Sequence, residues 1–165
     1  MAELRAASAA DAAALAAIYN PYIRDSVATF EETPLGATAM RERLAQVEAQ
    51  RLPWLVATVD DRVVGYSYAT AWRTRSAYRY SVESTVYLAP DAQRQGHGRA
   101  LMQALLDALQ PRGVHCVIAG ISLPNPGSVA LHEALGFAPV ARFPEVGYKF
   151  ARWVDVGYWQ RLLSG

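Results

Sequence analysis

The chain has 165 residues, of which 52% are hydrophobic and 19% charged, so it can bury a sizeable core and a wholly disordered protein is excluded. Its net charge of +1 gives no general attraction to nucleic acid or to an anionic membrane surface. The single cysteine, Cys116, cannot form a disulfide within the chain, and no Cys or His spacing is typical of a zinc site. We therefore expect one cytoplasmic domain over 1–165, without a metal, a nucleic-acid partner or a membrane segment.

Hydrophobic periodicity predicts an α+β chain in which strands and helices are mixed. Alternating apolar residues indicate strands, and apolar residues three and four positions apart indicate helices. The first helix is expected to end near Pro21, because proline disrupts a helix interior. In chain order the expected elements are a strand at 4–6, a helix from 8 to about 20, a loop at 24–35, a helix at 37–50, a hairpin of strands at 53–59 and 62–68, a loop at 73–79, a strand at 80–88, a helix at 98–110, a strand at 115–122, a helix at 128–135, and two strands within 137–163.

The junction between the strand at 80–88 and the helix after it has the features of an anion site. Gly96 and Gly98 let a ligand approach the backbone closely, and the free N–H groups at the start of the helix favour a phosphate. Arg94 and Arg99 flank the turn and can add charge-assisted hydrogen bonds. The spacing matches neither the P-loop nor the dinucleotide-binding fingerprint. A turn that merely joins a strand to a helix is the alternative.

This junction resembles the acyl-CoA loop of the GNAT N-acetyltransferases, Q/R-x-x-G-x-G/A, through Gln93, Gly96 and Gly98. Further segments are similar to the phosphinothricin acetyltransferase branch of that family: Val82–Tyr87, Leu123–Asn125, Leu131–Phe137, Gly147–Phe150 and Trp153–Gln160. The resemblance implies an α+β GNAT fold, with a mixed, mostly antiparallel sheet splayed around the acyl-CoA site and flanked by helices. It also implies direct transfer of acetyl from acetyl-CoA to the α-amine of phosphinothricin, methionine sulfoximine, methionine sulfone or a similar amino acid.

The same resemblance assigns residues to the acetyl-CoA site. A backbone N–H of Tyr87 or Leu88 would donate to the thioester oxygen, and Asn125 would bind the pantetheine arm. The alternative for Asn125, which lies between two prolines, is a turn residue. The residues implied to bind acetyl-CoA are Val86, Tyr87, Leu88, Gln93, Arg94, Gln95, Gly96, His97, Gly98, Arg99, Asn125 and Ser128.

Two side chains are candidates for proton transfer, because an ammonium group must lose a proton before its nitrogen attacks a thioester. Glu83 shares a strand face with Thr85 and Tyr87, and a salt-bridged glutamate on a solvated face is the alternative. The resemblance makes Glu83 the leading candidate for the base. His132 lies where many GNAT enzymes have a tyrosine that protonates the CoA thiolate. It is therefore either that acid or a second base, unless it only packs or caps the helix end.

The loop before the Glu83 strand is expected to hold the anionic part of the substrate, since guanidinium groups bind carboxylate and phosphinate in a two-pronged fashion. A solvated basic loop is the alternative. Phe30 resembles the aromatic residue that lines the substrate pocket, with a core anchor as the alternative. The substrate-binding residues are thus Phe30, Arg73, Arg75, Tyr78 and Thr85. Arg73 and Thr29 stand where herbicide-resistance members typically have lysine and asparagine, which leaves the amine open.

Other functions stay possible at this level. The chain either acetylates another small amine or an antibiotic, or is a non-catalytic acyl-CoA-binding module. Cys116 lies in an apolar strand and is expected to be buried and inert, which favours attack in a ternary complex over an acetyl-enzyme. This branch usually forms homodimers, and the aromatic C-terminal segment would supply an apolar patch, so a homodimer is expected.

Overall fold

The computed structural model describes residues 2–163, so Met1 and the last two residues of the expected domain lie outside the described part. The strands are β1 (Glu3–Ala6), β2 (Trp54–Val59), β3 (Arg62–Ala71), β4 (Ser81–Leu88), β5 (Cys116–Leu123), β6 (Ala138–Lys149) and β7 (Arg152–Leu162). The α-helices are α1 (Ala12–Asp25), α2 (Ala37–Ala49), α3 (His97–Leu109) and α4 (Pro126–Ala134). The expected strands and helices are thus present, and most of their ends differ from the prediction by a few residues.

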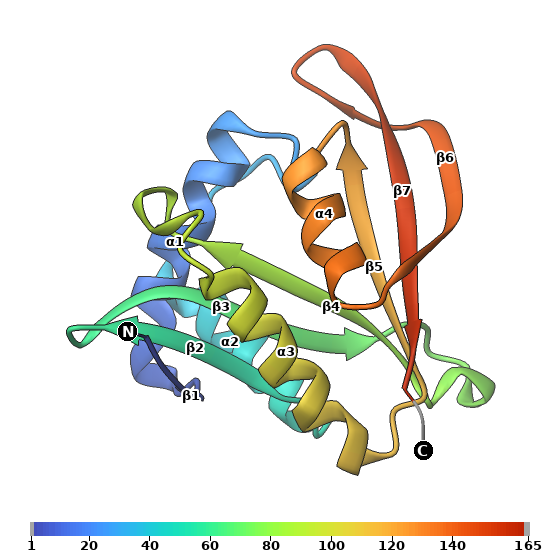
Figure 1. The fold of residues 1–165 in the computed structure, drawn as a ribbon. Helices are drawn as coiled ribbons and strands as arrows, with labels where there is room; N and C mark the ends of the chain where they lie inside the picture. Colours follow the sequence, from blue (N-terminus) through green and yellow to red (C-terminus); the bar gives the residue numbers. More distant parts are fainter. Residues whose placement is uncertain (1, 164–165) are drawn as a thin grey trace.

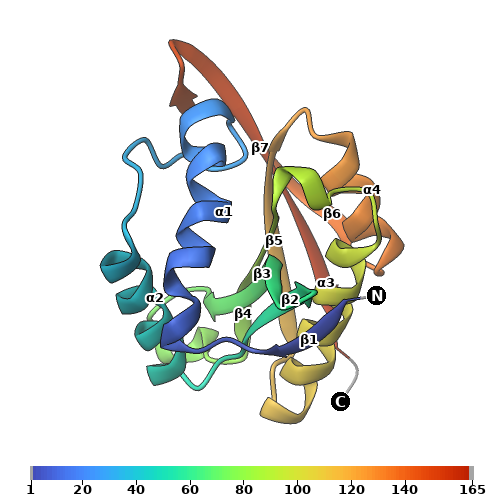
Figure 2. The ribbon, with the colours of Figure 1, turned by 90° about the vertical axis from the view of Figure 1, so that its left-hand side faces the viewer.

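Within the described residues the strands form one seven-stranded sheet of order β1-β2-β3-β4-β5-β7-β6 (Figure 1). Neighbouring strands are antiparallel except β4 and β5, which run parallel. Helices α1 and α2 lie on one side of the sheet, and α3 and α4 lie on the other (Figure 2). The expected mixed, mostly antiparallel sheet with flanking helices is confirmed.

Two apolar clusters hold the helices to the sheet. The first packs α1 and α2 on the N-terminal strands, and the second packs α3 and the end of α4 on the middle and C-terminal strands. In α3 the predicted apolar face is confirmed, because Leu101, Leu105 and Leu109 are fully buried. These clusters fix the N-terminus of α3 close to the end of β4.

Helix α1 does not end near Pro21, as the sequence predicts, but continues to Asp25. Ile23 is only 1% exposed, and the hydroxyl group of Tyr22 donates a hydrogen bond to the carbonyl oxygen of Leu88 in β4. These contacts offset the hydrogen bond that Pro21 cannot donate. The prediction was wrong because tertiary packing, rather than local propensity, decides where this helix ends.

The connection between β6 and β7 is a turn at Phe150 and Ala151, both of which have a left-handed backbone with φ of 54° and 56°. The two glycines of this region lie inside the strands. A Cβ atom at Gly147 would overlap the ring of Phe30, and one at Gly157 would lie 2.5 Å from the ring of Trp159. Gly147 therefore makes room for an aromatic ring from the loop after α1, and Gly157 makes room for the ring of Trp159 on its own strand.

Strands β4 and β5 pair at the start of β4, where Ser81, Val82 and Glu83 face Cys116, Val117 and Ile118. After Glu83 the two strands diverge, while β4 stays paired with β3 as far as Leu88 (Figure 1). The sheet is therefore splayed, as expected. The splay leaves the later part of β4 with one edge free for a ligand.

Candidate active site

Glu83 lies at the point where β4 and β5 separate. Its side chain is half-buried, and this burial raises the pKa of the carboxyl group above the usual range of a glutamate. Among the salt bridges of residues 2–163 none includes Glu83, so the alternative of a salt-bridged surface glutamate is not what the structure shows. A half-buried carboxylate without a salt bridge is a good candidate for a general base.

Two aromatic residues that the sequence analysis missed lie next to Glu83. Tyr158 of β7 is half-buried, and its pKa is raised first by burial and then by the nearby negative charge of Glu83. Trp72, directly after β3, packs edge-on against Tyr158 with 5.9 Å between ring centroids. Gly120 of β5 gives them room, because a Cβ atom there would lie 3.1 Å from the ring of Tyr158 and 3.5 Å from Oε2 of Glu83. These contacts join distant strands, and no sequence spacing indicates them.

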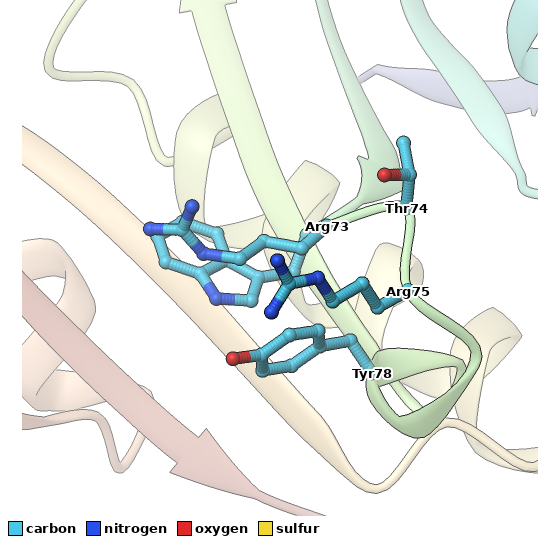
Figure 3. A pocket seen from close by; sticks show the side chains of 5 residues that line it. Arg73, Thr74, Arg75 and Tyr78 are labelled. Carbon is cyan, nitrogen blue, oxygen red and sulfur yellow. The ribbon is translucent and has the colours of Figure 1, made fainter.

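The arginine-rich loop forms an open pocket of about 560 Å³ beside these residues (Figure 3). The pocket is lined by Trp72, Arg73, Thr74, Arg75 and Tyr78. The side chains of Arg73, Arg75 and Tyr78 point to the same side, whereas Thr74 points away from them (Figure 3). The guanidinium carbon of Arg73 lies 5.1 Å from the ring centroid of Trp72, which is a cation–π contact. The loop therefore presents two exposed cations beside Trp72, whose ring packs on Tyr158, the aromatic neighbour of the predicted base.

The other two predicted substrate residues occupy different places. Thr85 lies opposite Tyr68 of β3 on the same strand face as Glu83. Phe30 is 40% exposed and its ring covers Gly147 of β6, so it is not a buried core anchor. Phe30 therefore lies where the loop after α1 contacts the β6–β7 hairpin.

Within the predicted acyl-CoA loop, Gly96 directly precedes α3 and has φ of 84°, a conformation that glycine adopts most easily. A Cβ atom at Gly98 would meet only ordinary contacts, 3.6 Å from Leu88 and from Leu131. Packing within the protein therefore does not require glycine at this position, whereas close approach of a ligand to the backbone would. The first N–H groups of α3 have no partner within the helix and suit a phosphate.

The remaining residues of the predicted acyl-CoA loop differ in how exposed their side chains are. Arg94 and Arg99 are exposed, as phosphate-binding side chains would be, whereas the side chain of His97 is buried. Gln93 donates from Nε2 to the hydroxyl oxygen of Tyr22 at 2.9 Å. The side-chain amide of Gln95 donates to the carbonyl oxygen of Asp91 at 3.3 Å. The two glutamines thus stabilise the loop itself, and His97 can offer a ligand only its backbone.

The hydrogen bonds along β4 show which of its backbone groups face the gap between β4 and β5. Ala89 donates its N–H to Val64 of β3, and the carbonyl oxygen of Leu88 points the other way, toward Tyr22. Because backbone groups alternate along an antiparallel pair, the N–H groups of Val86 and Leu88 face the splay and that of Tyr87 faces β3. The side chain of Tyr87 packs on Tyr22 as well. The register therefore favours Leu88 over Tyr87 as a donor to a thioester oxygen.

His132 lies on α4 with 4% of its surface exposed, and its ring packs edge-on against Phe137. Its Nδ1 atom lies 2.8 Å from the carbonyl oxygen of Ser128. A carbonyl oxygen only accepts, so Nδ1 carries a hydrogen and the neutral ring has its lone pair on Nε2. Burial is the main cause of a pKa lower than that of a free histidine, and the Ser128 carbonyl partly opposes it. This environment favours a proton acceptor over a proton donor.

Asn125 precedes α4, and its Oδ1 atom accepts a hydrogen bond from the backbone N–H of Ser128 at 3.1 Å. It is therefore the N-cap of α4, which agrees with the turn alternative. Binding of a pantetheine arm by Asn125 stays a prediction. Ser128 in turn fixes the ring of His132 through its carbonyl group.

Three further observations concern metal ligands, membrane-spanning helices and the single cysteine of the chain. Within residues 2–163 no three His, Cys, Asp or Glu side chains are grouped so that they could hold a metal ion. In the same part of the chain no helix is both long and apolar enough to span a membrane. Cys116 is a free, buried thiol, as predicted.

Residues 15–137 match the model of the acetyltransferase (GNAT) family. The chain belongs to this family. A phosphinothricin N-acetyltransferase of Streptomyces viridochromogenes is 43% identical over 159 residues, which cover 96% of this chain and 86% of that relative. An L-methionine sulfoximine/L-methionine sulfone acetyltransferase of Salmonella typhimurium is 38% identical over 98% of this chain and 94% of its own length. Both agree with the branch of the GNAT family that the sequence resembles.

A solved structure confirms the GNAT fold of this chain. The phosphinothricin acetyltransferase of Sinorhizobium meliloti, determined in complex with acetyl-CoA, superposes with a TM-score of 0.96 at 39% identity. The match covers 99% of this chain and 89% of that one. In the present GNAT protein the glycine-bearing start of α3 and the free edge of β4 stay the predicted positions for the diphosphate and the thioester end of acetyl-CoA.

Proposed function

We propose that this GNAT enzyme transfers acetyl from acetyl-CoA to the α-amine of phosphinothricin-like amino acids, which include phosphinothricin, methionine sulfoximine and methionine sulfone. One observation carries the proposal: Tyr158 connects Glu83, which is half-buried and without a salt bridge, to the pocket of Arg73 and Arg75, because Tyr158 is close enough to feel the charges of both Glu83 and Arg73 and its ring packs on Trp72 of that pocket. An amino acid with a second anionic or strongly polar group can place that group on the guanidinium groups and its amine at the carboxylate. The names of the relatives support this substrate class.

In the reaction Glu83 accepts a proton from the substrate ammonium group, directly or through one water molecule. The free amine attacks the thioester carbonyl that bound acetyl-CoA supplies. The C–N bond forms first and gives a tetrahedral adduct, whose oxyanion the backbone N–H of Leu88 stabilises. The nitrogen then loses its second proton to a base, the adduct collapses with cleavage of the C–S bond, the departing thiolate takes up one proton, and the amide product leaves.

His132 serves this reaction as a proton acceptor. Because its Nδ1–H is engaged by Ser128, the neutral ring can only accept at Nε2. Its lowered pKa keeps the ring neutral near neutral pH. We therefore assign the thiolate proton to solvent or to the substrate proton relay, and His132 to a second base.

A thiol-release assay tests the function. The wild type is offered acetyl-CoA with phosphinothricin, methionine sulfoximine, methionine sulfone, ordinary amino acids and a bulky aminoglycoside. We expect CoA release with the first three, and release with the aminoglycoside alone would refute the proposal. Measurable CoA binding without release for any amine would instead establish a non-catalytic acyl-CoA-binding module. Turnover of phosphinothricin would also make resistance to that herbicide testable in cells.

We also propose that the enzyme is a homodimer formed through the last hairpin. Large apolar side chains are exposed along β6 and β7, although such residues tend to be buried in a monomer. They are Val140, Phe143, Val146, Tyr148, Phe150, Trp153 and Leu162. Light scattering on a sizing column should give a dimer for the wild type and a monomer for Trp153→Arg, while Leu4→Arg on β1 is the control. A monomeric wild type would contradict the proposal.

A cytoplasmic location is the compartment that we propose for this enzyme. Its single cysteine is a free buried thiol, which does not depend on an oxidising environment. Fractionation of cells that express the chain should find it with cytoplasmic markers.

A further inference from the structure

Lys149 is the only lysine of the chain, and its side chain is almost completely buried at the end of β6. A buried ammonium group is unfavourable unless each of its three N–H groups has an acceptor. Nζ donates to the carbonyl oxygens of Ser26 at 2.6 Å and Thr29 at 2.8 Å, and it lies 3.5 Å from that of Tyr22. All three acceptors belong to the end of α1 and the segment that follows it.

The charges around Lys149 favour the ammonium form in this place. The C-terminus of α1 presents the negative end of the helix dipole to a cation. Glu32 and Glu31 also stabilise the positive charge, and they oppose the lowering of its pKa that burial causes. Arg43 of α2 binds Glu31 with both terminal guanidinium nitrogens. The lysine thus lies in a prearranged set of acceptors rather than at an accidental contact.

The segment 26–30, which we call the bridging loop, contacts both halves of the splayed sheet. On the β4 side the hydroxyl group of Tyr87 donates to the carbonyl oxygen of Ala28 at 3.3 Å. On the β6 side Lys149 holds the loop, and the ring of Phe30 covers Gly147. Figures 1 and 2 both show the end of α1 beside the far end of the β6–β7 hairpin. The bridging loop therefore spans the opening that begins at Glu83.

We propose that Lys149 is a positioning residue for the amine substrate. By holding the carbonyl groups of Ser26 and Thr29, it fixes the position of the bridging loop over the splay, and so the position of Phe30 in the wall of the amine site. The inference rests on the proposed function and on the prediction from the sequence that Phe30 lines the amine site. Lys149 itself does not contact the reacting atoms.

The first test replaces the ammonium group with an apolar side chain of similar length, Lys149→Met. Without its three hydrogen bonds the bridging loop moves, so amide hydrogen exchange at 26–30 should become faster. The KM for the amine should rise about tenfold because small displacements of a positioning element have large effects, while the KM for acetyl-CoA should change less than about twofold. Arg41→Met, which removes an exposed cation from α2, is the matched control and should change neither KM.

A second variant displaces Phe30 and leaves Lys149 unchanged. Gly147→Ala places a Cβ atom where the ring of Phe30 lies and must displace that ring. We expect the same rise in the KM for the amine, with the exchange protection of the bridging loop largely kept. If Lys149 acts through Phe30, then Lys149→Met should raise this KM less than about twofold in a Phe30→Ala background, because the two effects are not additive.

The outcomes separate this inference from the proposed function. A folded Lys149→Met variant with wild-type exchange at 26–30 or a wild-type KM for the amine overturns the inference. If that variant does not fold, an unchanged KM for the amine in Gly147→Ala overturns it. If the wild type acetylates no amine, the proposed function fails, and exchange at 26–30 alone decides whether Lys149 holds the bridging loop.

Discussion

Glu83 and Tyr158 face each other from opposite halves of the splayed sheet, and both lie over Gly120. A Cβ atom at residue 120 would approach the Tyr158 ring to 3.1 Å, a tighter contact than side chains normally make. The small size of this glycine therefore sets the distance between the predicted base and its aromatic neighbour. This relationship leads to the first prediction.

Gly120→Ala should lower the kcat of the enzyme about tenfold, because the new methyl group moves Tyr158 and the Glu83 carboxylate away from the amine. Gly120 has an ordinary negative φ, so the backbone is not strained by alanine. Steady-state kinetics with saturating acetyl-CoA measure the change. Gly36→Ala, where a Cβ atom meets nothing within 4 Å, is the control. A wild-type kcat in Gly120→Ala would contradict the proposed geometry.

Glu83→Gln should reduce kcat/KM for the amine by about 100-fold or more, since a general base typically contributes this much. The loss should be largest at pH values above the pKa of Glu83 but below that of the substrate amine, where the carboxylate is free to accept a proton and free amine is scarce. In the wild type, the raised pKa of Glu83 means that activity falls as pH drops through that value, because the protonated carboxyl cannot accept a proton. The pH–rate profiles of both proteins test this, with exposed Glu48→Gln as the control and unchanged acetyl-CoA affinity expected.

His132 should make the fold less stable below about pH 6.5, the ordinary pKa of histidine. Its pKa is lowered in the folded protein, so the unfolded chain takes up a proton in this range while the folded protein does not. Unfolding free energy measured in urea should therefore fall less with decreasing pH in His132→Gln than in the wild type. His115→Gln, at an exposed position, should keep the wild-type dependence. Nitrogen NMR should find the neutral ring protonated on Nδ1.

Gly98→Ala should separate cosubstrate binding from folding. The added methyl group meets only ordinary contacts, so the free energy of unfolding should change by less than about 1 kcal/mol. The dissociation constant of acetyl-CoA should rise roughly tenfold, equivalent to 1.4 kcal/mol, because the backbone of α3 can no longer approach the diphosphate closely. Titration calorimetry checks the affinity. An unchanged constant would remove the phosphate-loop assignment.

Local sequence signals predicted most of the elements and the order of the fold. The buried face of α3 follows from leucines at 101, 105 and 109, whose spacing alone determines one side of a helix. The end of α1 could not be predicted this way, since Ile23 and Tyr22 stabilise the helix beyond Pro21 through contacts with residues far along the chain. Similarly, the last turn forms at Phe150 and Ala151, where no turn residue indicates it.

The same division applies to the candidate site. The glycine-bearing loop and Glu83 lie on one continuous stretch, so a motif indicates them. Trp72, Tyr158 and Lys149 reach their places through strand pairing between distant segments, and their residue types are equally common in ordinary cores. In the sequence, a single lysine two residues after a glycine is at most a weak sign of a functional role. That role is indicated only by the three backbone carbonyl groups that Lys149 contacts in the structure.

The short parallel contact between β4 and β5 has a mechanical consequence. When the two halves of a sheet move about the point where they are joined, the displacement is smallest at that point and grows with distance from it. Glu83 lies at the junction of the two halves, whereas Leu88 and the end of β5 lie far from it. A small opening motion between the two halves can therefore admit a long, bulky cosubstrate without displacing the Glu83 carboxylate.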